Sequence, residues 1–192
     1  NSSTGTDGNG VQVLDLAEEG AAPVEIFEGF GNNHSYVGND GETFFFQTDL
    51  GAPNGRIVSV SLSDPQTLTD VVSEGDGPIT GADHVGGHLI VETMRDVASA
   101  VSVYTPAGVF VREVDLPGLG VASGFGGDPA RSETFYSYES LNQPPALYRY
   151  DVETGESEVF RAPELTFNPD DYVVSQTFYE STGGARIPMF VA

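Results

Sequence analysis

The sequence contains no cysteine and no lysine. Without cysteine the chain can form neither a disulfide framework nor a cysteine-ligated zinc site, and its redox compartment stays open. No apolar run approaches the roughly 20 residues of a membrane span, and no signal-peptide pattern is present. The chain begins without methionine on residues 1–10, which have the composition of a loop. We therefore expect it to be a segment of a longer protein.

Positive charge is scarce. All seven basic residues are arginine, against 29 acidic residues, so the formal net charge is −22. This charge repels itself and disfavours a compact state at low salt, whereas at about 1 M salt the Debye length is roughly 3 Å. We interpret the composition as adaptation to a salt-rich cytoplasm; a merely acidic soluble protein is the alternative. Nucleic acid and anionic membrane are poor partners because neither finds a basic patch.

The remaining composition favours an all-β fold. The 192 residues can bury a sizeable core, and 24 glycines and 12 prolines indicate many turns. The clearest pattern runs from Thr134 to Pro163, where residues 134–138, 146–150 and 158–161 have the β-branched, aromatic and alternating character of strands. Breaks at Asn142–Pro145 and Glu153–Glu156 separate these strands. Strand, loop, strand, tight turn and strand make most of a four-stranded antiparallel blade.

The same order recurs along the chain. Gly41, Gly87 and Ser132 each precede the second strand of a unit, with spacings of 46 (87 − 41) and 45 (132 − 87) residues. Four strands in a period of this length are typical of β-propeller blades, and an unrelated β-sandwich is the alternative. Turns are expected at Gly38–Gly41 and at Asp64–Pro65. The other expected strands are residues 11–16, 24–27, 34–37, 43–48, 56–62, 68–72, 79–85, 88–94, 101–104, 110–114 and 120–125.

The pattern changes after Pro163. Residues 164–171 read as a linker, and two longer strands, 172–179 and 185–191, form a hairpin across Ser181–Gly184. Pro188 within the second strand indicates an edge position or an irregularity. This hairpin does not fit the blade order, so we assign it to a second domain.

A search for catalytic motifs is mostly negative. The sequence has no Gly-x-Ser-x-Gly elbow, Walker loop, zinc spacing or His-Glu-x-x-His. His34, His84 and His88 are the only histidines, and structural or channel-facing roles are favoured over catalysis or metal binding. The glycine-rich run Gly124–Gly127 lacks a following helix and is interpreted as a turn. The acids Asp170–Asp171 and those of 151–158 are interpreted as a solvated face. We expect no catalytic, cofactor-binding or metal-binding residue and no cofactor.

Several segments in a fixed order resemble the prolyl oligopeptidase (prolyl endopeptidase) family of serine peptidases. The likeness runs from about Val11 to the end, and its most specific part is the final hairpin with Ile187–Phe190. The matching segments are residues 27–29, 36–41, 44–49, 52–56, 116–120, 125–127, 147–151, 154–156, 159–161, 171–172, 176–179 and 186–190.

The resemblance implies a seven-bladed propeller capping an α/β-hydrolase domain that uses a Ser-Asp-His triad to cleave short peptides after proline. It implies that the propeller keeps folded proteins from the site. Residues 1–163 are then the C-terminal blades, about three and a half, and residues 164–192 are the linker and first hairpin of the hydrolase domain. The triad lies beyond Ala192, so no catalytic residue is placed on this chain. The absence of lysine departs from the usual family surface.

Two other interpretations stay open. The chain is alternatively a non-catalytic propeller that binds partners through unpaired blade edges, although the final hairpin counts against this. A sister peptidase with different cleavage specificity is the third possibility, because the specificity pocket lies outside this chain. On the leading interpretation the partners are the chain's own hydrolase domain and short proline-containing peptides, in the cytoplasm.

Overall fold

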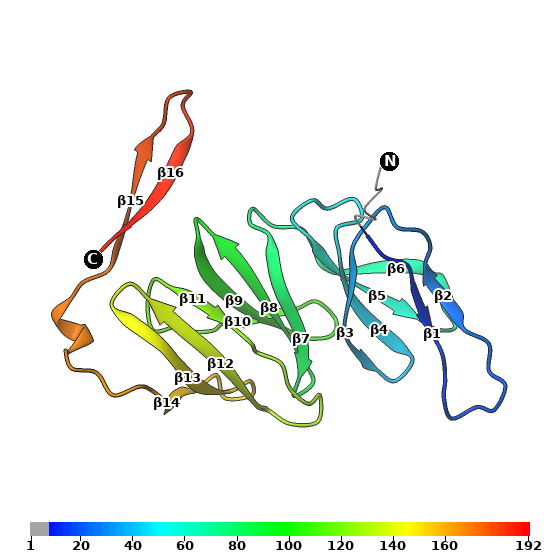
Figure 1. Cartoon of the computed structure of the whole chain (residues 1–192). Helices are drawn as coiled ribbons and strands as arrows, with labels where there is room; N and C mark the ends of the chain where they lie inside the picture. Colours follow the sequence, from blue (N-terminus) through cyan, green and yellow to red (C-terminus); the bar gives the residue numbers. More distant parts are fainter. Residues whose placement is uncertain (1–7) are drawn as a thin grey trace, which may run out of the picture. The chain divides into compact units, whose positions relative to one another are not determined.

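The computed structural model describes residues 8–192, in which regular structure is almost entirely β-strand. The loop expected at residues 1–7 lies outside this range. The described chain divides into two compact units, one of residues up to 78 with 106–108 and one of residues 79–105 with 109–192. Figure 1 shows each four-stranded sheet as an antiparallel meander.

The first unit contains half a blade and one complete blade. β1 (Val11–Val13) pairs with β2 (Val24–Phe27). The complete sheet has the order β3 (His34–Asp40), β4 (Thr43–Thr48), β5 (Arg56–Ser61) and β6 (Asp64–Val72).

The second unit contains two blades and a hairpin. The first sheet has β7 (Ile79–Val85), β8 (His88–Arg95), β9 (Ala98–Tyr104) and β10 (Phe110–Glu113) in sequential order. The second has β11 (Val121–Ser123), β12 (Glu133–Ser140), β13 (Gln143–Asp151) and β14 (Ser157–Arg161). A short 3-10 helix, η1 (Pro169–Asp171), precedes the hairpin of β15 (Ser175–Glu180) and β16 (Arg186–Val191).

Within each unit, hydrophobic side chains of neighbouring sheets pack together. In the first unit Ile26 and Phe27 of the half blade pack with Phe46, Val58 and Val60 of the complete blade. In the second unit the core lies between the two blades. The residues that form it are Val85, Ile90, Val101, Val103, Val114, Ala122, Phe125, Tyr136, Tyr138, Ala146, Tyr148, Tyr150 and Val152. A lone blade leaves an apolar face in water, so the pairing of sheets accounts for the burial.

The three four-stranded sheets, together with the two-stranded sheet β1–β2 as half a blade, confirm the expected partial propeller. The counted period is confirmed as well. Gly41, Gly87 and Ser132 lie just before β4, β8 and β12, which are the second strands of their sheets. β4 is apolar on both faces, as expected, and Phe45 and Phe46 are both 1% exposed.

Two expected turns were wrong in the first unit. β3 continues to Asp40, and the turn is Gly41–Glu42. The register between β3 and β4 shifts at a bulge between Tyr36 and Gly38, and Asn39 and Asp40 remain paired with β4 beyond it. Asp64–Pro65 belongs to β6, and the turn is Leu62–Ser63. β6 is the last strand of its sheet, where a proline without an N–H is tolerated.

The expected break at Asn142–Pro145 was also placed too late. The turn is Leu141–Asn142, and both prolines, Pro144 and Pro145, lie inside β13. They fall where the register with β12 shifts and before the pairing with β14 begins at Leu147. Several other strand limits differ from the expected ones; among them, β1 ends at Val13, where its pairing with β2 ends, and β15 starts only at Ser175.

Candidate functional site

His34, at the start of β3, is held as part of the first unit's core. Its ring stacks on Phe27 with 3.8 Å between ring centroids and 8° between planes. Its Nδ1 lies 2.9 Å from the hydroxyl of Thr48. Burial lowers the pKa of His34, and the nearby carboxylate of Asp49 opposes this only in part. The imidazole of His34 is stacked on a neighbouring ring, has a lowered pKa and uses one nitrogen in a hydrogen bond. We therefore interpret His34 as a structural residue.

His84 and His88 belong to the second unit. His84 is buried near the end of β7. His88 opens β8, and its Nδ1 lies 2.9 Å from the carbonyl oxygen of Gly86, so Nδ1 carries the proton and donates it. Between residues 8 and 192 no three or more histidine, cysteine or acidic side chains gather as a metal site requires. The contacts of His34 and His88 are those of structural groups, and the expected lack of a catalytic or metal-binding role stays a prediction.

The glycine-rich run after β11 does bind an anion, but the anion is a side chain of the same chain. The backbone N–H groups of Gly124 and Phe125 donate hydrogen bonds to the carboxylate of Glu92, which is 6% exposed on β8. The run is a turn, as expected, and it ties one blade of the second unit to the other. We call this contact the Glu92 clamp. Glu92 was not singled out from the sequence.

A second carboxyl group, that of Asp83 on β7, lies beside the clamp. Burial raises the pKa of Asp83. Burial is also the main cause of the raised pKa of Glu92; the charge of Asp83 adds to it, and the two backbone N–H groups oppose it. Glycines make room for both acids: a Cβ at Gly81 would lie 3.2 Å from Glu92 Oε1, and one at Gly126 would lie 3.5 Å from Asp83 Oδ1.

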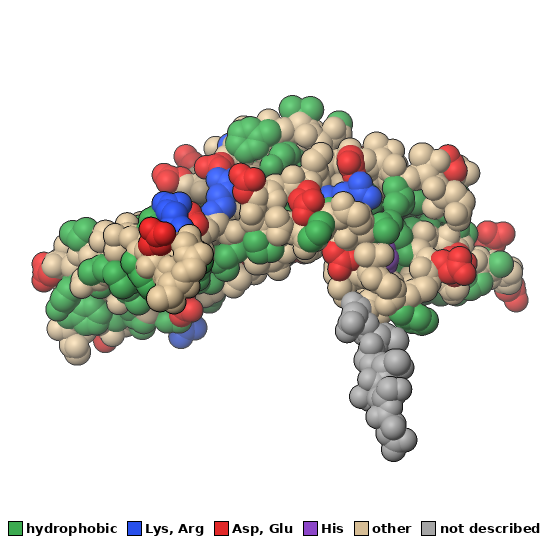
Figure 2. Space-filling view, turned by 90° about the horizontal axis from the view of Figure 1, so that it is seen from above, with side chains coloured by type: hydrophobic (Ala, Val, Ile, Leu, Met, Phe, Trp, Pro, Cys, Tyr) green, Lys and Arg blue, Asp and Glu red, His purple; other side chains and the backbone are tan. Residues whose placement is uncertain are grey.

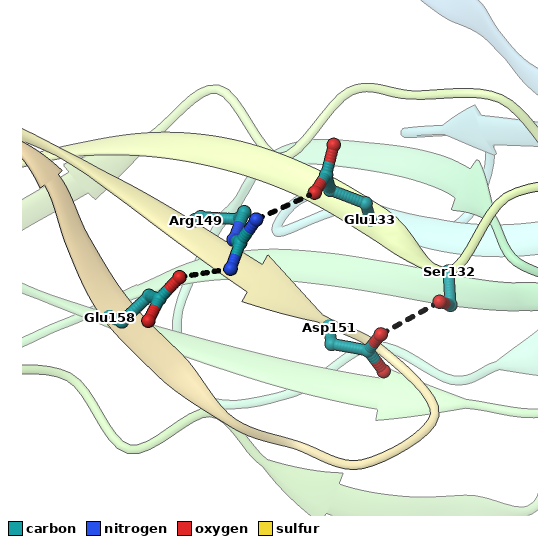
Figure 3. Close-up of polar contacts among 5 residues, drawn as sticks. All are labelled: Ser132, Glu133, Arg149, Asp151 and Glu158. Carbon is teal, nitrogen blue, oxygen red and sulfur yellow. Dashed lines mark hydrogen bonds and ion pairs between the residues drawn. The ribbon is translucent and has the colours of Figure 1, made fainter.

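The acidic stretch 151–158 forms the turn between β13 and β14. Asp151 accepts hydrogen bonds from the backbone N–H groups of Glu153 and Thr154 at 3.0 and 2.9 Å. It also accepts one from the hydroxyl of Ser132 at 2.8 Å (Figure 3). The Thr154 bond, followed by the Ser132 bond, holds the pKa of Asp151 below its ordinary value. Asp151 is therefore the residue that fixes this turn.

Arg149 lies between two glutamates on the exposed face of the last blade (Figure 3). Its guanidinium pairs with Glu133 at 3.4 Å and with Glu158. These groups border a shallow hollow of about 610 Å³, whose lining carries four acids and one arginine. The ion pairs are partly exposed and together contribute little to stability. This face is solvated, as expected.

Acidic side chains are spread over the surface in Figure 2, and the few arginines lie beside them. Ion pairs with acids are formed by Arg56, Arg95, Arg131 and Arg149. A basic patch of the kind that binds phosphate backbones is not visible on this face. In the described range no helix is long and apolar enough to cross a bilayer.

The segment after residue 163 contacts the blades of the second unit at two places, one at η1 and one at the hairpin β15–β16. Asn142 donates to the carbonyl oxygens of Pro169 and Tyr172 at 3.1 and 3.2 Å. Gln176 donates to the carbonyl oxygen of Asp96, in the turn between β8 and β9, at 2.6 Å. Asp170 and Asp171 lie in η1, an exposed turn capped by the side chain of Asn168.

Comparison with known proteins places this architecture in a family. The profile described as "Prolyl oligopeptidase, N-terminal beta-propeller domain" matches residues 1–163. The prolyl endopeptidase of Elizabethkingia miricola is 36% identical over 97% of the chain, and that of Elizabethkingia meningoseptica is 37% identical over 97%. The chain spans only 26% of the length of each relative.

Solved structures agree. A chain from a structural and mechanistic study of two prolyl endopeptidases, concerned with inter-domain dynamics, has a TM-score of 0.84 at 32% identity. The match covers 97% of this chain and 28% of that one. Prolyl oligopeptidase B from Galerina marginata also has a TM-score of 0.84, at 23% identity, over 94% of this chain and 27% of its own. At that identity the second likeness shows the fold alone.

Proposed function

Because the chain belongs to the prolyl oligopeptidase N-terminal β-propeller family, we propose that it is the C-terminal part of the propeller of a prolyl endopeptidase. The complete polypeptide cleaves short peptides after proline, and this segment limits which substrates reach the catalytic site. The observation that carries the proposal is the identity of 36–37% with two prolyl endopeptidases over nearly the whole chain.

Residues 164–192 are proposed to return the chain to the peptidase domain. The family match ends at residue 163, where the blade pattern also ends. The hairpin β15–β16, which follows η1, forms a separate two-stranded sheet. The serine, aspartate and histidine of the triad then belong to the polypeptide after residue 192. They pass the acyl group of the substrate first to the serine and then to water.

The contribution of this segment is structural. In its sheets, polar side chains such as Asp151 and Glu92 hold turns and neighbouring blades in place. Such a scaffold selects substrates by size and leaves the bond-breaking to another domain. The charge of −22 supports a further proposal, that the protein works in a salt-rich cytoplasm.

The test is a cleavage assay on the complete polypeptide in about 1 M salt. A short chromogenic peptide with proline before the scissile bond is compared with the same peptide carrying alanine there. We expect preference for the proline peptide, and cleavage of an unfolded 30-residue peptide but not of a folded protein with the same sequence exposed. Equal rates on both peptides would favour a sister peptidase, and no cleavage by a native polypeptide of only 20.3 kDa would favour a binding module.

A further inference from the structure

The segment that connects β11 to β12 has no regular secondary structure and crosses to the preceding blade of the same unit. We call residues 124–132 the strap. The N–H groups of Gly86 and Gly87, in the β7–β8 turn, donate to the carbonyl oxygens of Asp128 and Pro129 at 3.2 and 2.9 Å. Backbone hydrogen bonds thus fasten the second half of the strap to the neighbouring blade.

The first two residues of the strap are fastened by the Glu92 clamp. Gly124 and Phe125 donate their N–H groups to the carboxylate of Glu92 on β8. The ring of Phe125 is fully buried and stacks on Tyr136, with 4.5 Å between ring centroids. Gly124 has φ of +98°, which glycine adopts without strain. The clamp therefore fixes the point at which the strap leaves the core of the unit.

Asp83 lies on the same face of the blade as Glu92. Gly81 on β7 is paired with Glu92 on β8, and Asp83 follows Gly81 by two positions. Side chains two positions apart in a strand point to the same face, so Asp83 and Glu92 are diagonal neighbours across the strand pair. A Cβ at Gly126 would lie 3.5 Å from Asp83 Oδ1, so the carboxyl group of Asp83 also lies beside the strap.

The other titratable or charged groups of the elements packed here point away or have partners of their own. His84 follows Asp83 and therefore points to the opposite face of β7. Asp128 pairs with Arg131 at 3.8 Å within the strap. Two further groups have partners at a distance from the clamp: His88 on β8, which contacts the Gly86 carbonyl oxygen, and Glu133 on β12, which pairs with Arg149. Asp83 is the charged neighbour that acts on Glu92.

Two carboxylates in a partly dry site repel each other, and burial disfavours the charge on each. Burial raises the pKa of Asp83 and, with the charge of Asp83, that of Glu92. The N–H groups of the strap favour one ionised carboxylate, and they oppose this shift only in part. A closed strap is therefore satisfied by one negative charge and one proton. Because the groups interact, that proton belongs to the pair rather than to either residue.

We propose that Asp83 and Glu92 share one proton and that its loss releases the strap, which makes the contact between the two blades of the second unit sensitive to pH. Release lets both carboxylates reach water, so opening is coupled to the loss of the proton. The strap is held at low pH and loosens as the pH rises through the raised pKa of the closed pair. The inference is independent of the proposed function.

Hydrogen exchange of the complete polypeptide, followed by mass spectrometry from about pH 5 to pH 9 in about 1 M salt, measures this opening. Each rate is divided by the intrinsic rate of an unstructured chain at the same pH. One proton lost per opening makes the corrected rate of residues 124–132 rise by about tenfold per pH unit, until it levels off above the pKa of the closed pair. Gly86 and Gly87 should follow, because their N–H groups bond to the strap.

The β13–β14 turn is an internal control. Asp151 accepts N–H groups there as Glu92 does in the clamp, but its pKa lies below the ordinary value. Asp151 is therefore already ionised throughout this pH range, and the corrected exchange rate of residues 152–156 should stay constant. Since the parent protein supplies both segments, this comparison stands even if a variant fails to fold.

Three variants assign the effect to the pair. D83N and E92Q should each end the rise at a lower pH than in the parent, because the remaining carboxyl group has lost its charged neighbour. The double variant D83N/E92Q should give a constant corrected rate. D151N is the matched control: it removes a carboxylate from the other N–H-binding turn and should leave the profile of the strap unchanged.

Four outcomes overturn the proposal. A constant corrected rate in the parent shows that no proton controls the strap, and a rise of about a hundredfold per pH unit shows two independent protons. A rise confined to residues 124–127, with Gly86 and Gly87 unchanged, shows that the strap stays in place. A profile that shifts when sodium replaces potassium at constant ionic strength assigns the pair to a small cation.

Discussion

The Glu92 clamp offers a test of how the two blades of the second unit are held together. The perturbations are E92A, which removes the acceptor, and E92Q, which removes the charge but keeps an acceptor oxygen. In E92A the N–H groups of Gly124 and Phe125 lose their partner. Phe125 is buried whereas Gly124 is exposed, so one buried donor is left unsatisfied, which costs about 1–3 kcal/mol of unfolding free energy.

The pH dependence gives the sign of the charge effect. Burial raises the pKa of Glu92 above its ordinary 4.5, so between these two values the folded chain binds more protons than the unfolded chain. The stabilising contribution of protonated Glu92 is therefore complete below pH 4.5 and is lost as the pH rises through the raised pKa. E92Q removes this loss and should be at least as stable as the parent at pH 7.5. Burial also raises the pKa of Asp83, so the unfolding free energy of E92Q should still fall with rising pH, but less steeply than that of the parent.

The assay is urea unfolding of the parent, E92Q and E92A at pH 5 and pH 7.5 in about 1 M salt, which screens surface charges but screens buried ones much less. E92A should lose stability at both pH values, and the parent should lose more than E92Q between pH 5 and 7.5. If E92Q is as unstable as E92A, or if it keeps the full pH slope of the parent, the clamp does not work as described.

Three further predictions test the fold. The isolated 192-residue chain should need molar salt to be compact, and a full β signal with sharp melting in dilute buffer, followed by circular dichroism, would contradict this. G86A should be more destabilising than G87A in thermal melting, since both have positive φ but only at Gly86 would a Cβ lie 2.6 Å from Val152; equal losses would show that close packing there is unimportant. F125A should cost about 3–5 kcal/mol, because the ring is fully buried, and a loss below 1 kcal/mol in urea unfolding would refute the proposed core.

The repeat was readable from the sequence because its signals are local. Strand alternation and turn residues depend on neighbours within a few positions, and Gly41, Gly87 and Ser132 mark the same structural position in three sheets. The strands β2, β4 and β7 match their expected limits. The family likeness was readable for the same reason, since it rests on ordered short segments.

Turns were predicted at some prolines and glycines that in fact lie within strands, because pairing with the neighbouring strand outweighed the local preference for a turn. Pro144 and Pro145 lie inside β13 at a place where the register with β12 shifts and where pairing with β14 has not yet begun. Residues without an N–H are tolerated there. Gly38 lies in β3 because a bulge there keeps the strand paired. Bulges depend on the partner strand, which a single segment of sequence does not reveal.

The sequence by itself determined the strand order, the period and the net charge, all of which depend on residue types and their spacing along the chain. Only the tertiary structure decided which polar and apolar groups meet. Glu92 carries a weak signal, a lone acid in an apolar strand, but its N–H partners come from a turn more than 30 positions away. The contact of Asp96 with the hairpin carries none, because the hydrogen bond from Gln176 to its carbonyl oxygen forms only when segments 80 residues apart come together.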